Sequence, residues 1–109
     1  MRIPSARMYR VEILPIAQRD LVEIARYVAT TLESTKAAEQ LFMKLIDGIN
    51  SLGSMPYRKM VYTPLKHLDK EYRALRIGSY LIFYWVDEEE QLVTVARVIY
   101  AKADIAERF

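Results

Sequence analysis

The residues best suited to chemistry in this chain are cations, and they gather in its middle. Residues 53–76 carry six Lys and Arg against two acids, whereas residues 77–109 carry three against six. The net charge of the whole chain is only +2, so the excess is local. A local excess of positive charge suits a partner that carries phosphates or carboxylates. A solvated surface loop would give the same pattern, and this alternative stays open.

The sequence contains few of the residue types that other kinds of site need. His67 is the single histidine, there is no cysteine, and we therefore expect no metal site, no cofactor and no Ser-His-Asp arrangement. The lack of cysteine suits a reducing cytosol. No apolar run approaches the roughly 18–20 residues of a membrane helix. The sequence therefore favours a cytoplasmic protein.

The chain is long enough for one domain, and we divide it into an N-terminal extension, residues 1–8, and a single domain, residues 9–109. Residues 9–14 alternate between apolar and polar, which predicts a strand. Pro15 then suits the first turn of a helix over residues 16–32, whose polar face includes Asp20 and Glu23. Ser34 or Thr35 can cap a second helix, and Gly53 supplies its stop.

The second half of the domain predicts a loop followed by a sheet. Residues 53–71 have no clean period and contain two prolines, so we expect a loop with at most a short helical turn. Residues 72–77, 80–86 and 92–100 are rich in β-branched and aromatic residues and predict a three-stranded meander. Residues 101–109 form a short terminal helix or a tail. The fold class is α+β, ordered β-α-α-β-β-β, with a helical hairpin on one face of a small, mainly antiparallel four-stranded sheet.

Two segments of the chain resemble a known family. The opening YRVEILPIAQRDLVEIARYV is similar to that of the RelE/ParE superfamily, in which a strand reaches a Pro-containing turn and enters a helix carrying Asp-Leu. The later YRALRIGSYLIFYWVDEEEQLVTVARVIYAKADI resembles the family's arginine strand, Gly-containing turn, aromatic strand and final strand. The resemblance covers about residues 9–108. It implies the toxin of a bacterial type II toxin–antitoxin system.

The end of the last strand indicates the branch. VARVIYAKADI is nearer to the ParE or plasmid-stabilisation branch than to the mRNA-cleaving RelE branch. The sequence also departs from the ParE-like ending. Tyr100 stands where His is common, Ala101 where Gly is common, and Ala103 leaves Lys102 as the cation beside Asp104. The apparent loss of one arginine weakens the case for cleavage chemistry.

The resemblance also implies which residues to test. RelE-type cleavage uses the 2′-hydroxyl of an mRNA nucleotide to attack the neighbouring phosphate, so the site must stabilise negative charge and move protons. The catalytic candidates are Arg76, Arg97, Tyr100 and Lys102. The candidates for binding the target or a phosphate are Arg73, Lys66 and Lys70.

These candidates have different strengths and simpler alternatives. Arginine suits phosphate but is a poor base, because its planar donor fork keeps its proton. Tyr100 or Lys102 would need a pKa well below the ordinary value of about 10 to act as a base. Arg76 can simply be solvated, and Tyr100 can be an edge aromatic. Arg97 shares the parity of Val93 and Val95, an odd place for a cation unless it pairs with an acid or lines a groove. One hypothesis is that Arg73, Arg76, Arg97 and Lys102 converge on one groove, where exposed arginines add little to the stability of the fold.

Three functions remain open from the sequence. The resemblance implies a ParE-like toxin that docks on DNA gyrase, a RelE-like ribosome-dependent mRNA endoribonuclease, or a degenerate relative that binds its antitoxin and poisons nothing. The expected partners are a cognate antitoxin and either gyrase or the ribosome with its mRNA, and no membrane. The assembly would be a homodimer or a toxin–antitoxin hetero-oligomer.

Overall fold

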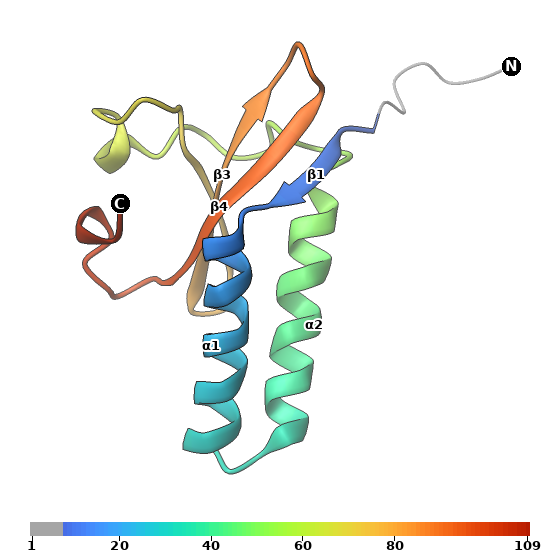
Figure 1. The fold of residues 1–109 in the computed structure, drawn as a ribbon, viewed down its shortest axis with the longest axis vertical. Helices are drawn as coiled ribbons and strands as arrows, with labels where there is room; N and C mark the ends of the chain where they lie inside the picture. Colours follow the sequence, from blue (N-terminus) through green and yellow to red (C-terminus); the bar gives the residue numbers. More distant parts are fainter. Residues whose placement is uncertain (1–7) are drawn as a thin grey trace, which may run out of the picture.

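Two antiparallel helices cover one face of a four-stranded sheet in the computed structural model, which describes residues 8–109 (Figure 1). The expected N-terminal extension lies outside the described residues, apart from Met8. The strands and helices are β1 (Arg10–Ile13), α1 (Pro15–Thr31), α2 (Thr35–Ser51), β2 (Arg73–Ile77), β3 (Tyr80–Asp87) and β4 (Leu92–Tyr100). This order confirms the α+β prediction.

Helix α1 follows β1 directly, and a short turn joins it to α2. Pro15 occupies the first turn of α1, where its missing N–H has no helical partner to lose. The Ser34 hydroxyl accepts a hydrogen bond from the Ala37 N–H at 3.1 Å, which confirms the predicted cap of α2. The predicted helix extended to residue 32, but Leu32 follows the end of α1 and is 62% exposed.

Two glycines mark close approaches of the backbone. A Cβ at Gly48 would lie 2.9 Å from the Cδ1 of Ile77, so the small residue lets α2 approach β2. Gly53 lies beyond the end of α2, and a Cβ there would lie 3.0 Å from the carbonyl oxygen of Tyr9. Gly53 was expected to end the helix. Helix α2 does end just before it, at Ser51. The Gly53 carbonyl also accepts a 2.7 Å hydrogen bond from the Tyr9 N–H, which ties the start of the domain to the end of α2.

The sheet has the strand order β1-β4-β3-β2, with β1 parallel to β4 and the other pairs antiparallel. One irregularity interrupts the β3–β4 ladder. Phe83 pairs with Arg97, whereas Tyr84 pairs with Val95, so Ala96 is an extra residue in β4. Such a bulge changes the face toward which the following side chains point.

The face of the sheet toward the helices carries the main core. Its buried side chains include Leu45 and Ile49 of α2, Ile82 and Tyr84 of β3, and Val95 of β4. None of the described helices is long and apolar enough to cross a membrane.

A smaller apolar cluster covers the opposite face. It is built on Phe83 and Ile99 of the sheet, Leu65 of the long loop and Ile105 of the C-terminal segment. The loop contains one short helical turn, Thr63–Leu65, and the C-terminal segment another, Ala106–Arg108. Both turns agree with the sequence prediction. In Figure 1 the loop and the C-terminal segment lie together, on the side of the sheet away from the helices.

Candidate functional site

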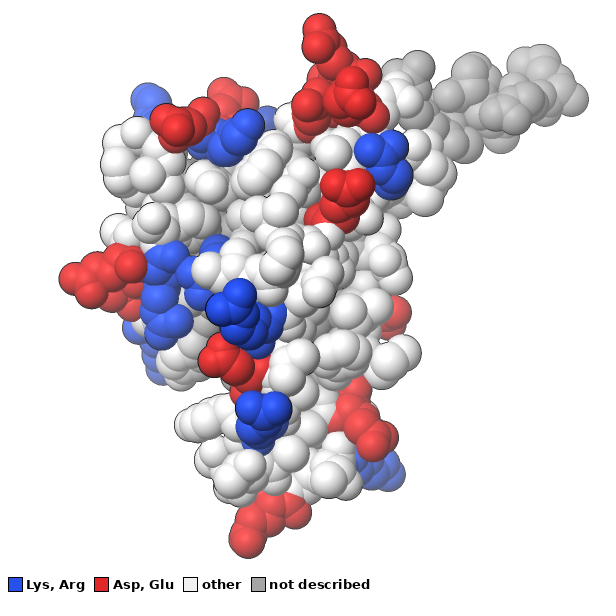
Figure 2. Space-filling view, in the orientation of Figure 1, with Lys and Arg blue, Asp and Glu red and all other residues white. Residues whose placement is uncertain are grey.

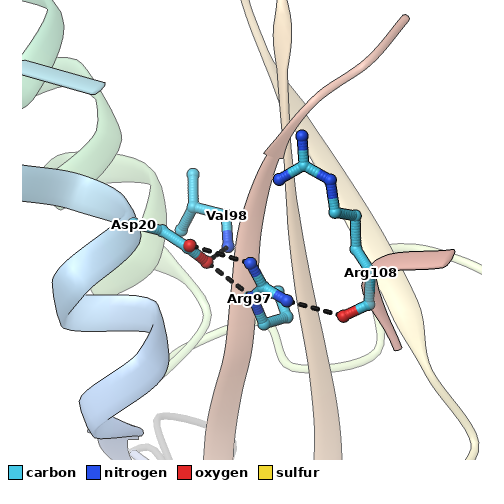
Figure 3. A network of polar contacts seen from close by, with 4 residues as sticks. All are labelled: Asp20, Arg97, Val98 and Arg108. Atoms are coloured by element: carbon cyan, nitrogen blue, oxygen red, sulfur yellow. Dashed lines mark hydrogen bonds and ion pairs between the residues drawn. The ribbon is translucent and has the colours of Figure 1, made fainter. Parts of the chain in front are cut away.

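An ion pair between α1 and β4 forms the most developed polar arrangement in the described residues (Figure 3). Arg97 donates from Nε to Oδ2 of Asp20 at 2.8 Å and from Nη2 to Oδ1 at 2.9 Å. The Val98 N–H donates to the same Oδ2 at 2.9 Å. Arg97 also donates from Nη1 to the carbonyl oxygen of Arg108 at 2.6 Å. We call the Asp20–Arg97–Val98 contacts the clamp.

The sheet topology explains why the clamp forms at this place. Strand β1 ends at Ile13, opposite Val95, so the next part of β4 has no strand beside it on that edge. An unpaired buried N–H is costly, and the carboxylate of Asp20 supplies the missing acceptor for Val98. The bulge at Ala96 turns Arg97 away from the face of Val93 and Val95. The guanidinium nevertheless reaches the same carboxylate of Asp20.

The clamp is buried and holds both charges firmly. The side chains of Arg97 and Asp20 are only 13% and 11% exposed. Hydrogen bonding to Asp20 raises the pKa of Arg97, so the guanidinium keeps its charge. A bidentate Arg–carboxylate pair is both strong and specific in geometry. The clamp therefore fixes the end of β4 against α1.

The clamp corrects two predictions. Arg97 was grouped with the exposed cations of one groove, but its guanidinium is engaged on three nitrogens within the fold. The expected parity with Val93 and Val95 was wrong because the bulge adds one residue. From the sequence, an arginine at position 97 was expected to need either an acidic partner or a groove. Asp20 meets that condition, although we had assigned it to the polar face of α1.

The two arginines of β2 project from opposite faces of the sheet. Arg76 is exposed, and its Nε donates to the carbonyl oxygen of Gly78 at 2.8 Å. Arg73 shares the parity of Leu75, which belongs to the main core. Its guanidinium lies 5.0 Å from the ring centre of Tyr57 and also donates to the carbonyl oxygen of Lys59. The expected convergence of Arg73 and Arg76 on one groove is therefore wrong.

The candidate lysines are exposed and lie in different places. Lys66 follows the short turn of the long loop, and Lys102 follows the end of β4. The ammonium of Lys70 lies 5.0 Å from the ring centre of Trp85, a distance that suits a cation–π contact. Lys70 and Arg73 both line a cavity that also contains several carboxylates, so the expected basic groove is here a site of mixed charge.

Tyr100 lines a groove between α1 and the end of β4. The groove has a volume of about 480 Å³, and its walls combine aliphatic side chains with three tyrosines. The residues that line it are Asp20, Glu23, Ile24, Tyr27, Tyr80, Val98, Ile99, Tyr100 and Arg108. Tyr27 is 64% exposed and Tyr100 is 45% exposed, so large aromatic surfaces face the solvent. Aromatic side chains with a polar end are common anchors of protein interfaces.

Charge is unevenly distributed over the surface. Figure 2 shows carboxylates over the turn between β3 and β4, and Lys and Arg side chains gathered on the side where the C-terminal segment lies. The turn contains Asp87, Glu88, Glu89 and Glu90, all exposed.

The resolved pKa shifts of the tyrosines are the reverse of those a general base would need. Burial raises the pKa of Tyr80, which lies beside Tyr100, and also that of Tyr72. The hydrogen bond that Tyr57 donates to Glu88 raises the pKa of Tyr57 to about 12. A tyrosine base must lose its proton near neutral pH, so these shifts disfavour that role. His67 is exposed in the long loop, away from the clamp residues in sequence.

The comparisons with known proteins point to one family. The sequence model described as "ParE toxin of type II toxin-antitoxin system, parDE" matches residues 11–105. No curated protein sequence matches the chain significantly.

Among solved structures, a chain of the chromosomal ParDE system of P. aeruginosa is similar with a TM-score of 0.71 and 12% identity, covering 88% of this chain and 99% of that one. An archaeal RelE–RelB complex from Pyrococcus horikoshii gives a TM-score of 0.59 and 17% identity, with 87% and 97% covered. The RelBE2 complex of Mycobacterium tuberculosis gives 0.52 and 24%, with 87% and 94% covered. These structures share the fold. Because the family model spans nearly the whole domain, the protein belongs to the ParE toxins of type II toxin–antitoxin systems.

Proposed function

We propose that this toxin inhibits growth by docking on DNA gyrase, without chemistry of its own, and that a cognate antitoxin neutralises it. The observation that carries the proposal is that the guanidinium of Arg97 is already bound within the fold. RelE-type cleavage needs cations free to meet a phosphate, but the one arginine of β4 is bound to a carboxylate and a backbone carbonyl. The family match to ParE favours the same branch.

The remaining candidates suit binding better than proton transfer. Arg76 and Lys102 are exposed and can pair with acidic groups of a partner. Tyr100 and Tyr27 supply the exposed aromatic surface that interface anchors use. We therefore assign Arg76, Tyr100 and Lys102 to target contact. Arg97 and Asp20 hold the strand that carries Tyr100.

Arg73, Lys66 and Lys70 form a separate group of proposed contacts. Lys66 and Lys70 belong to the long loop, and Arg73 begins the strand that follows it. Two of these cations already rest on aromatic rings, Lys70 on Trp85 and Arg73 on Tyr57. Their side chains are thus partly ordered before a partner arrives, which lowers the entropic cost of binding.

The antitoxin belongs to the proposal because of the surface that the chain leaves open. Several large apolar side chains are more than half exposed, including Tyr27, Leu32, Met43 and Met60. Exposed apolar surface marks an interaction site when it is extensive. The similar structures are ParDE and RelE–RelB assemblies, and we expect a toxin–antitoxin hetero-oligomer or a homodimer.

Co-expression with an adjacent short reading frame should raise the soluble yield of the toxin. Full recovery of the toxin alone would count against an obligate partner.

Induced expression in bacterial cells tests the target. A toxin that stalls gyrase in the cytoplasm should switch on a DNA-damage reporter while translation continues. A RelE-like endoribonuclease, the alternative reading, would stop translation within minutes and leave cut mRNA. Arg76→Ala should weaken growth inhibition, and Arg19→Ala is the matched control because Arg19 is an exposed arginine of α1. Translation arrest with mRNA fragments, and no damage response, would refute gyrase as the target.

A further inference from the structure

The last eight residues, 102–109, cross the sheet face that the helices leave uncovered. We call this segment the C-terminal strap. Just before the strap, the Ala101 N–H donates to the carbonyl oxygen of Ser79, between β2 and β3, at 2.8 Å. Beyond it, the backbone N–H groups of Ala103, Arg108 and Phe109 donate to carbonyl oxygens only three residues earlier. The strap is therefore outside the hydrogen-bond ladder of the sheet.

Three anchors hold the strap in place. Ile105 is 8% exposed and packs with Phe83 and Ile99. The ring of Phe109 meets Tyr72 with 4.8 Å between ring centres, and Phe83 with 5.3 Å. The third anchor is polar, because Nη1 of Arg97 donates to the carbonyl oxygen of Arg108 (Figure 3). The side chain of Arg108 points away from this contact, so only its backbone takes part.

The clamp does not depend on the strap. Asp20 binds Nε and Nη2 of Arg97, whereas the strap uses Nη1 alone. If the strap leaves, Arg97 stays oriented by Asp20 and presents Nη1 to the solvent beside Phe83, its partner across the β3–β4 ladder. A neutral carbonyl is also a weaker acceptor for a guanidinium than an anionic oxygen. An anionic group on a binding partner would therefore replace the Arg108 carbonyl as the acceptor for Nη1, and this would release the third anchor.

We propose that the C-terminal strap is a reversible cover that opens as a unit, while the rest of the domain stays folded, and so controls access to Phe83, Ile99 and Arg97. Local units with few tertiary anchors and no ladder hydrogen bonds open far more often than whole domains unfold. Opening also carries two cations, Lys102 and Arg108, and two acids, Asp104 and Glu107, away from the sheet, so the net charge of this face does not change. This inference does not rest on gyrase as the target.

Native-state hydrogen exchange on the unaltered protein tests the opening. The amides of Ala103, Arg108 and Phe109 should exchange at least about 100-fold faster than the ladder amides of β3 and β4, with little dependence on denaturant. The Nε proton of Arg97 should stay protected, because Asp20 holds it through the opening. Strap amides that exchange only at the rate of global unfolding, with the same denaturant dependence, would overturn the proposal.

A pair of variants tests what the opening uncovers. Phe109→Ala removes one anchor, and because Phe109 is 38% exposed the fold should survive. This variant should bind the apolar dye ANS severalfold more strongly than the unaltered protein, while its thermal transition stays cooperative. Met43→Ala is the control, since Met43 is 57% exposed on α2, away from the strap. Unchanged dye binding by Phe109→Ala, or an equal increase with Met43→Ala, would contradict the proposed cover.

Discussion

Removing either side of the clamp should destabilise the fold far more than the loss of an exposed charge would. Arg97→Ala leaves the carboxylate of Asp20, a residue that is 9% exposed, with only the Val98 N–H as donor. Asp20→Ala leaves both the guanidinium and that N–H without the acceptor. Breaking one side of a buried ion pair costs about 3–5 kcal/mol. For a domain of this size, each kcal/mol lowers the midpoint of thermal unfolding by about 4–8 °C.

A double-mutant cycle separates the clamp from general damage. Asp20→Ala, Arg97→Ala and the combined variant are compared by urea unfolding, with Arg19→Ala and Arg26→Ala as exposed controls on α1. Because both single changes break the same contacts, the combined loss should fall short of their sum by at least about 1 kcal/mol. Each control should change the free energy of unfolding by less than about 0.5 kcal/mol.

Two results would refute this reasoning. A loss below about 1 kcal/mol for Arg97→Ala would mean that the guanidinium behaves as an exposed charge, as the sequence alone had suggested. Additive losses in the combined variant would mean that Asp20 and Arg97 act on stability separately. Either result would also remove the argument that Arg97 is engaged in the fold and not free for cleavage.

Three further predictions concern the core, a tyrosine and the exposed arginine of β2. Leu45→Ala should lower the free energy of unfolding by about 2–5 kcal/mol because Leu45 is 0% exposed, and urea melts should show a smaller loss for Ile46→Ala, since Ile46 is half-buried. Tyr57 should lose its proton at about pH 12 in an NMR titration, and Glu88→Gln should lower that pKa toward 10, because the charged acceptor is gone. The raised pKa stabilises the fold fully below pH 10, and this stability is lost as the pH rises toward 12. Arg76→Ala should weaken growth inhibition at equal expression while changing stability by less than about 1 kcal/mol, and Arg76→Lys should restore it only in part.

The fold was predictable because its local signals agree with one another. The alternation in β1, Pro15, the Ser34 cap and the apolar spacing of α2 each favour the element that forms. Gly53 lies in the turn after α2, as predicted, but the sequence did not indicate that its small size also allows contact with the backbone of Tyr9. A sequence can indicate that a glycine is needed at a position, but it does not indicate which neighbouring atoms leave no room for a Cβ.

The candidate site was less predictable because it depends on one inserted residue. The pattern LVTVARVIY reads as continuous alternation, and no residue type in it signals the bulge at Ala96. Asp20 carried a signal that was overlooked, because it lies one turn after Ala17 and next to Leu21, at the margin of the buried stripe. An acid at such a margin, together with an arginine in a strand otherwise apolar, is a pattern that predicts an ion pair between helix and sheet.

The most direct measurement of the central claim uses purified components. Gyrase is assayed for DNA supercoiling with the toxin, with the toxin plus its antitoxin, and with Arg76→Ala, while a parallel reaction supplies ribosomes and mRNA. We predict that the toxin inhibits supercoiling, that the antitoxin relieves the inhibition, and that the mRNA stays intact. Uninhibited gyrase together with ribosome-dependent mRNA cleavage would contradict the account.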